Sequence, residues 1–157
     1  MITISKELSN LGGIARIWLI PSRLISSAHY NFPTTLLQLP MNWDTDAWEL
    51  TPVFQSASWT QEQQSTIAGT YYENTVAFKL PKVTYDSRSF ISLITNETWT
   101  VMLMDQNKQF LLMGSQEYPM RSTIKTSTGS EISDLNHLAV TISGKSPILP
   151  VFIEFTL

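Results

Sequence analysis

The chain has 157 residues, no cysteine, a net charge of -3 and only 15% charged residues. This length suits one domain, which buries roughly 68–70% of the surface of its unfolded chain, so neither disulfides nor a structural metal are required. The absence of cysteine excludes disulfides, thiolate catalysis and sulfur-ligated metals. The acidic balance, with a pI near 5.3, argues against attraction to a phosphate backbone. Hydroxyls and amides must supply most of the polar surface, which suits contacts with neighbouring subunits.

The first third of the chain predicts one strand followed by an irregular region. Ile14 to Ile20 is rich in β-branched and aromatic residues, is apolar on both faces except at Arg16, and stops at Pro21. Arg16 also interrupts the apolar run, so we expect neither a signal peptide nor a transmembrane helix, and the default is a product made in the cytoplasm. Residues 22–66 have no sustained periodicity and are expected to form an irregular arm within a single domain spanning 1–157.

The middle of the chain predicts extended structure. Trp48 to Trp59 reads as an extended segment placed at an edge by Pro52, and Thr60 to Ser65 reads as a loop because it is polar throughout. Tyr71 to Leu80 alternates and predicts a half-buried strand. Its buried face would carry Tyr72, Val76, Phe78 and Leu80, and its solvent face Glu73, Thr75 and Lys79.

One helix and a hairpin follow. Lys82 to Asn96 has apolar residues at three-to-four spacing, with Thr84 and Asp86 as capping candidates. Thr98 to Met104 and Gln109 to Met113 are apolar runs separated by turn residues, so they predict a hairpin buried on both sides. The helix and the hairpin are expected to pack together.

The last third contains two alternating segments, Met120 to Thr126 and His137 to Ser143, joined by a polar loop, and a final strand from Val151 to Phe155. The sum is seven or eight strands and one helix. The fold expected from the sequence is therefore mainly β: an antiparallel β-sandwich or partly closed barrel with one flanking α-helix.

No catalytic, cofactor-binding or metal-binding site is predicted. His29 and His137 are far apart in sequence and no nucleophile elbow is present, which argues against a hydrolase triad. The acidic groups lack the spaced, glycine-bent loop of dedicated calcium sites and read as solvated turns. These groups are Asp44, Asp46 and Glu49, and Glu131 with Asp134.

Three tryptophans in the loop-rich region offer an alternative function. Trp43, Trp48 and Trp59 could stack on sugar rings, as in a β-sandwich carbohydrate-binding module. Large aromatics serve more often as core or interface anchors, and we favour that interpretation.

The stretch from Gly114 to Gly144 carries a resemblance to a known group of proteins. The order that carries the resemblance is the apolar hairpin, Met113-Gly114-Ser115, a short acidic turn through Glu117, Pro119-Met120-Arg121, Thr128-Gly129-Ser130 followed by Asp134, and a closing strand into Ser143-Gly144. It resembles segments of small structural proteins of tailed phages and prophages from Bacteroides-like gut bacteria. The Gly12-Gly13-Ile14 opening also resembles theirs. Residues 22–66 carry no such match.

The resemblance implies a tail-tube-like virion protein, non-enzymatic, that forms homo-oligomeric rings in the phage neck or tail. Its partners would be portal, neck or tail proteins, with the phage genome passing through without specific binding, and no membrane or cofactor is implied. The strands of the apolar hairpin would then join those of neighbouring copies in a closed barrel. The interface residues expected on this basis are Thr126, Thr128, Gly129, Ser130, Glu131, Asp134, Trp43 and Trp48. The residues expected to face an acidic channel are Glu73, Asp105 and Glu117.

Overall fold

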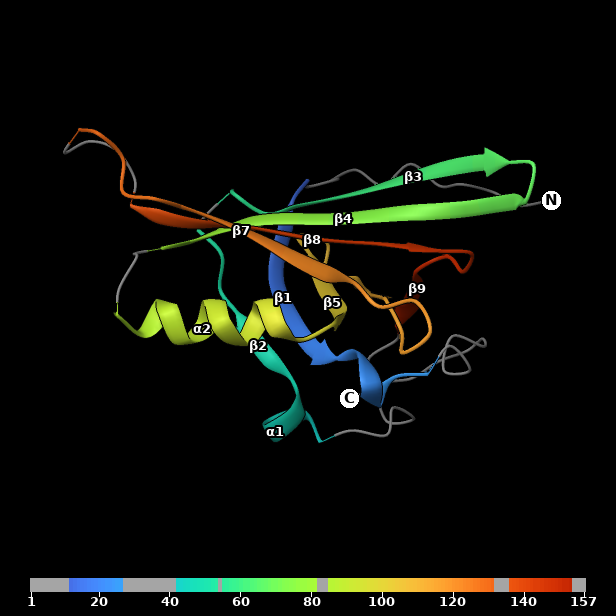
Figure 1. The fold of residues 1–157 in the computed structure, drawn as a ribbon, viewed down its shortest axis with the longest axis horizontal. Coiled ribbons are helices and arrows are strands. Elements are labelled where there is room, and N and C mark those ends of the chain that lie inside the picture. The colour runs from blue at the N-terminus through green and yellow to red at the C-terminus, as the bar shows by residue number, and fades with distance from the viewer. Residues whose placement is uncertain (1–11, 27–41, 54, 82–84, 132–135, 154–157) are drawn as a thin grey trace.

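The computed structural model describes residues 12–26, 42–53, 55–81, 85–131 and 136–153. Within these ranges two antiparallel sheets and one longer helix form the open sandwich shown in Figure 1. The mainly β, sandwich-like expectation is confirmed, whereas the partly closed barrel is not, because each sheet has two edges.

The five-stranded sheet has the order β2-β1-β5-β6-β9. Its strands are β1 (Ile14–Pro21), β2 (Trp48–Leu50), β5 (Trp99–Asp105), β6 (Phe110–Met113) and β9 (Val151–Ile153). The β5–β6 hairpin lies at the centre, with β1 on one side and β9 on the other. Both outer edges of the hairpin are therefore paired within the chain. The expectation that this hairpin joins neighbouring copies is wrong for that reason.

The four-stranded sheet has the order β3-β4-β8-β7. Its strands are β3 (Ser58–Thr66), β4 (Gly69–Pro81), β7 (Arg121–Ser127) and β8 (His137–Ser146). The two strands expected in the Gly114 to Gly144 stretch are confirmed as β7 and β8, which pair with each other.

Two apolar clusters explain the burial of the central strands. The first fills the space between the sheets: Val76, Phe78, Val140 and Ile142 of the four-stranded sheet meet Ile17, Leu19, Val101 and Leu103 of the five-stranded sheet. The second includes Ile20, Met102, Leu112, Val151 and Ile153, on the opposite face of the five-stranded sheet. The hairpin is thus buried on both sides, as its uninterrupted apolar pattern predicts.

Helix α2 (Tyr85–Asn96) runs below β7 in Figure 1. Its end at Asn96 agrees with the sequence-based boundary, and residues 82–84 lie outside the described ranges. Ile94 is fully buried, and Phe90, Ile91 and Leu93 pack against the core between the sheets. The helix contributes its apolar stripe to the sandwich, as expected.

The predicted irregular arm is partly regular. After the 3-10 helix η1 (Ser22–Leu24), the described part of 22–66 contains the short helix α1 (Trp43–Asp46), β2 and the whole of β3. Only Trp48–Leu50 and the start of β3 are strand within the expected extended segment 48–59.

The loop predicted over Thr60 to Ser65 is a strand. These residues form the greater part of β3 and pair in continuous register with β4, from Ser58 opposite Ala77 to Thr66 opposite Gly69. Every residue of β3 except Trp59 is exposed. Because neither face of this strand is buried, the sequence lacks the apolar alternation that identifies a strand, and the β4 partner defines it instead.

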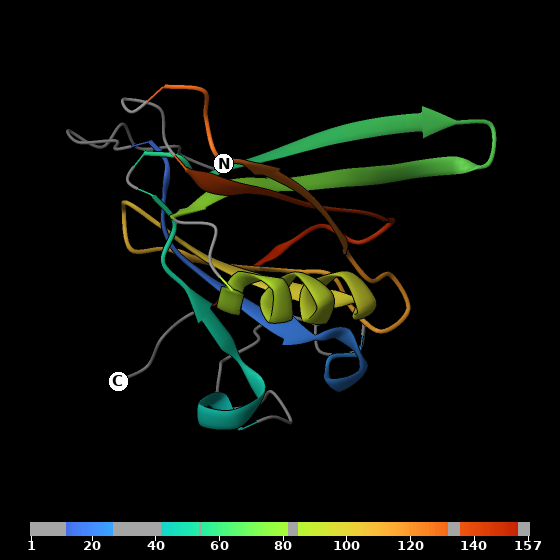
Figure 2. The ribbon, with the colours of Figure 1, turned by 60° about the vertical axis from the view of Figure 1, so that its left-hand side comes forward.

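The β3–β4 hairpin projects past the other strands in both views (Figures 1 and 2). Its tip is the two-residue turn Ile67-Ala68, closed by Gly69 at a φ of +130°. Since Gly69 takes the positive φ, the two turn residues are free of that demand.

Candidate assembly surfaces

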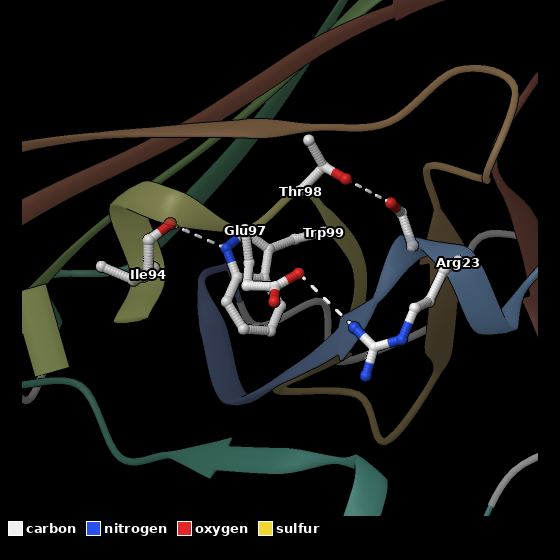
Figure 3. Close-up of polar contacts among 6 residues, drawn as sticks. Arg23, Ile94, Glu97, Thr98 and Trp99 are labelled. Carbon is white, nitrogen blue, oxygen red and sulfur yellow. Dashed lines mark hydrogen bonds and ion pairs between the residues drawn. The ribbon is translucent and has the colours of Figure 1, made fainter. Parts of the chain in front are cut away.

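The joint between α2 and β5 is held by polar contacts from three parts of the chain (Figure 3). The carbonyl of Ile94 accepts hydrogen bonds from the buried Trp99 indole N–H at 2.9 Å and from the Ser122 hydroxyl at 2.7 Å. The last carbonyls of a helix have no partner within the helix, so these bonds satisfy one of them from β5 and β7. This joint is structural and fixes the helix against the sandwich.

The η1 side of the same joint is more exposed. The hydroxyls of Ser22 and Thr98 bond to each other, and the Arg23 guanidinium lies 3.5 Å from the Glu97 carboxylate (Figure 3). A second ion pair joins Arg16 to Glu49, also at 3.5 Å. Both pairs are on the surface and are worth about 0–1 kcal/mol each.

Both glycines that bound the Gly114 to Gly144 stretch lie against the side chain of Met120. A Cβ at Gly114 would lie 2.9 Å from the Trp99 carbonyl oxygen and 3.1 Å from Met120 Cγ, and one at Gly144 would lie 3.0 Å from the same Met120 atom. The backbones of Met120 and Trp99 exchange both hydrogen bonds. The two glycines that bound this stretch are therefore needed for the close approach of three chain segments.

The residues expected at an interface fall into two separate places. Thr126 belongs to β7, and Thr128, Gly129, Ser130 and Glu131 follow it on an exposed loop; Asp134 lies outside the described residues. Trp48 is 43% exposed on β2, an edge of the five-stranded sheet. Trp43 begins α1, and its side chain is outside the described part of the structure.

The residues expected to face a channel are also dispersed. Glu73 lies on β4, Asp105 ends β5, and Glu117 follows β6. Because β6 runs from the turn after Asp105 to the loop before Glu117, these two carboxylates lie at opposite ends of that strand. The three do not form one acidic surface.

The solvent face of the four-stranded sheet carries a mixed charge. The register of β4, β7 and β8 places four cations on this face: Lys79, Arg121, Lys125 and Lys145. Two carboxylates lie on the same face, Glu62 on β3 and Glu73 opposite it on β4. Among the described residues no carboxylate lies within ion-pair distance of these four cations. Small residues lie between them: Thr75, Ala77, Thr123, Ala139, Thr141 and Ser143. The result is a flat, hydroxyl-rich face with four cations and two carboxylates.

The described tryptophans do not form one sugar-stacking platform. Trp48 lies on β2 and Trp59 on β3, which belong to different sheets. The Trp59 indole donates to the side chain of the buried Asn74 at 3.3 Å and packs against the core. This tryptophan is an anchor of β3, as the core interpretation of the aromatics expects.

A cleft of about 320 Å³ opens at the base of the β3–β4 hairpin. Its walls come from β3, β5, β6, β9 and the start of β1, and they include Ile14, Trp59, Leu103, Leu111 and Phe152. Gly12 and Gly13 lie at its margin. Phe152 is 56% exposed, so the cleft has an apolar wall open to solvent.

The described residues contain no cluster of metal-ligating side chains. No three His, Asp or Glu side chains within them come together as a metal site requires. His137 starts β8, and His29 lies outside the described ranges. None of the helices that the structure describes is long and apolar enough to cross a membrane.

Comparison of the chain with protein-family models, with curated protein sequences and with solved structures gives no match. The surfaces described above are therefore the basis for any functional argument.

Two surface features, the hairpin tip and the cleft, are not predicted from the sequence. A signal for the tip does exist: Ile67 is the one large apolar residue in the run Thr60 to Thr70, and Gly69 follows it as a turn residue. No sequence signal marks the cleft, because its walls come from the β5–β6 hairpin and from three strands that are distant from it in sequence, β1, β3 and β9.

Proposed function

We propose that this protein is a non-enzymatic structural subunit that assembles with copies of itself into a ring, as part of the neck or tail tube of a phage particle. The observation that carries this proposal is the four-stranded sheet with its projecting hairpin. The edge strands of that sheet, β3 and β7, both have free backbone edges within the described residues. Such edges are templates for pairing with another chain.

A ring would use both edges at once. Pairing β3 of one copy with β7 of the next would continue the four-stranded sheet from subunit to subunit, and closure of the ring would leave that sheet without a free edge. β3 pairs with β4 over nine residues, from Ser58 to Thr66, and beyond Trp59 it is polar on both faces. The part from Thr60 to Thr66 buries no apolar surface of its own, so its length is better explained by contact with another chain.

The polar face of the four-stranded sheet is suited to line a channel through which DNA passes without sequence-specific binding. Its hydroxyls and small residues offer no deep groove for base recognition, and its charges are of both signs. An acidic channel would require carboxylates in addition to Glu62 and Glu73, because four cations share that face. The resemblance to phage tail-tube-like proteins supports the virion assignment and the neck and tail partners.

The experiment that tests the proposal is the measurement of molar mass by light scattering after size-exclusion chromatography, together with negative-stain electron microscopy. We expect rings or short stacks of rings whose abundance rises with protein concentration. A strictly monomeric protein at high concentration, absent from purified particles, would contradict the proposal.

The carbohydrate-binding alternative now concerns a different surface. Tyr71, Tyr118 and Pro147 line a shallow depression, with the Lys145 ammonium 5.6 Å from the centre of the Tyr71 ring. Aromatic faces of this kind can stack on sugars. Binding to a glycan array that disappears in Tyr71→Ala and Tyr118→Ala variants would support this alternative.

A further inference from the structure

The tip of the β3–β4 hairpin presents a single large apolar side chain to solvent. Ile67 is fully exposed, and its turn neighbours Thr66, Ala68 and Gly69 carry no charge. Along the nine residues of β3 only Trp59, at the opposite end, is large and apolar. Ile67 is therefore not the continuation of an apolar strand face, and no packing requirement of its own fold accounts for it.

The cleft at the base of the same hairpin is suited to an apolar occupant. Its volume of about 320 Å³ is sufficient for an inserted side chain. Most of its accessible wall area is apolar, and Ser58, Asp105, Asn107 and Gln109 supply the polar part. Two of its polar groups already have partners. The Asp105 carboxylate accepts hydrogen bonds from the backbone N–H groups of Asn107 and Gln109, both at 2.8 Å, and the Trp59 indole N–H donates to Asn74.

A small polar ligand is less well matched to this cleft. Ligand sites usually combine an apolar lining with polar groups that remain available to orient the ligand. Here the indole N–H and one oxygen of the Asp105 carboxylate are used within the chain, and the cleft offers an occupant more apolar than polar area. Phe152 contributes the most exposed part of that area.

The tip cannot fill the cleft of its own molecule. The eight residue steps from Trp59 at the cleft to Ile67 at the tip correspond to ~26 Å of extended strand. We propose that Ile67 of one copy inserts into the cleft of a second copy, so that each subunit carries a projection and a receptor at opposite ends of β3. The contact brings together two of the large apolar side chains that a single copy leaves exposed, Ile67 and Phe152.

This contact gives a direction to the assembly and rests on the proposed ring function. A projection and a receptor on different surfaces make a head-to-tail contact, which closes into rings or continues as a helical filament according to the rotation between copies. It adds side-chain specificity to backbone pairing between edge strands, which alone selects a partner weakly.

The absence of cysteine from the chain allows a direct test by site-directed cross-linking. Ile67→Cys protein is mixed with Gln109→Cys protein, whose new thiol lies at the exposed margin of the cleft, and a short bis-maleimide is added. We expect covalent dimers in which peptide mapping joins positions 67 and 109. Thr141→Cys, on the exposed face of β8 away from the cleft, is the matched control and should give no such product with Ile67→Cys.

A second pair of variants separates the tip contact from charge effects. Ile67→Asp should weaken self-association at least about tenfold, the loss typical of removing an interface anchor. Thr70→Asp places the same charge three residues away from Ile67, on the exposed end of β4, which is not an edge strand, and it should retain wild-type association. Circular dichroism of both variants checks that the sheet is intact.

The outcomes distinguish the two proposals. If the wild-type protein forms rings but Ile67→Asp assembles normally and no 67–109 link forms, the tip-in-cleft contact is overturned while the ring function stands. If the wild-type protein stays monomeric at every concentration, both fail. Links from position 67 that map to position 141 instead would also overturn the contact.

Discussion

Gly114→Ala should destabilise the fold through two effects, backbone strain at a positive φ and steric overlap of the new Cβ. Alanine variants of Gly12, Gly13 and Gly114 separate these two effects. Gly114 has a φ of +86°, and its new Cβ would lie 2.9 Å from the Trp99 carbonyl oxygen, a backbone atom of the adjacent strand. Gly13 has a similar φ of +96° but nothing within 4 Å of its Cβ position, and Gly12 has open space with no positive φ. The three variants therefore isolate backbone strain from steric overlap.

The expected magnitudes follow from these geometries. Gly12→Ala should be near neutral, because it loses no contact and reduces the entropy of the unfolded chain. Gly13→Ala should lose about 1–2 kcal/mol from left-handed strain. Gly114→Ala should lose a further ~1–3 kcal/mol, since the Trp99 carbonyl belongs to a buried strand and has little room to move.

The assay is equilibrium unfolding in urea followed by tryptophan fluorescence. All variants are compared at one protein concentration, because self-association adds to the apparent free energy of unfolding. Equal losses for Gly114→Ala and Gly13→Ala would refute the reasoning, because the close approach of Trp99 and Met120 to Gly114 would then have no energetic consequence.

Three further predictions concern the joint, the surface and the core. Trp99→Phe and Ser122→Ala should each lower the free energy of unfolding by about 1 kcal/mol or more, because each removes a hydrogen bond to the Ile94 carbonyl. Amide hydrogen exchange should then be faster at the end of α2. Unchanged exchange would contradict the role of the joint. Arg23→Ala should change the free energy of unfolding by less than ~1 kcal/mol, and this difference should vanish at high salt. A larger loss that does not depend on salt would show that the Arg23–Glu97 ion pair is more than a surface contact. Ile142→Ala should lower the free energy of unfolding in urea by ~2–5 kcal/mol, because the side chain is fully buried. Ile67→Ala should leave the free energy of unfolding of the monomer within ~0.5 kcal/mol of wild type. Similar losses for the two variants would contradict the exposed position of the tip.

The predictable parts of the fold are those in which at least one strand face is buried. β4 and β8 alternate because their inner residues meet the core, and β5 and β6 are continuously apolar because apolar clusters lie on both faces. The end of α2 at Asn96 and the pairing of β7 with β8 follow from the same periodicities.

The parts that failed are those whose structure depends on a distant partner. The sequence predicts a loop over Thr60 to Ser65 because this polar run has no period of its own, and only its pairing with β4 makes it a strand. The central place of the β5–β6 hairpin depends on β1 and β9, which come from the two ends of the described chain. The cleft and the dispersal of Glu73, Asp105 and Glu117 likewise depend on topology, which a single sequence does not encode locally.

The measurement that tests the account most directly is the sedimentation velocity of the wild-type chain over a wide concentration range, with the same samples viewed by negative-stain microscopy. The account predicts a concentration-dependent shift from monomer to a discrete ring species, visible as annular particles. A single monomer boundary at every concentration, with no annular particles, would contradict it.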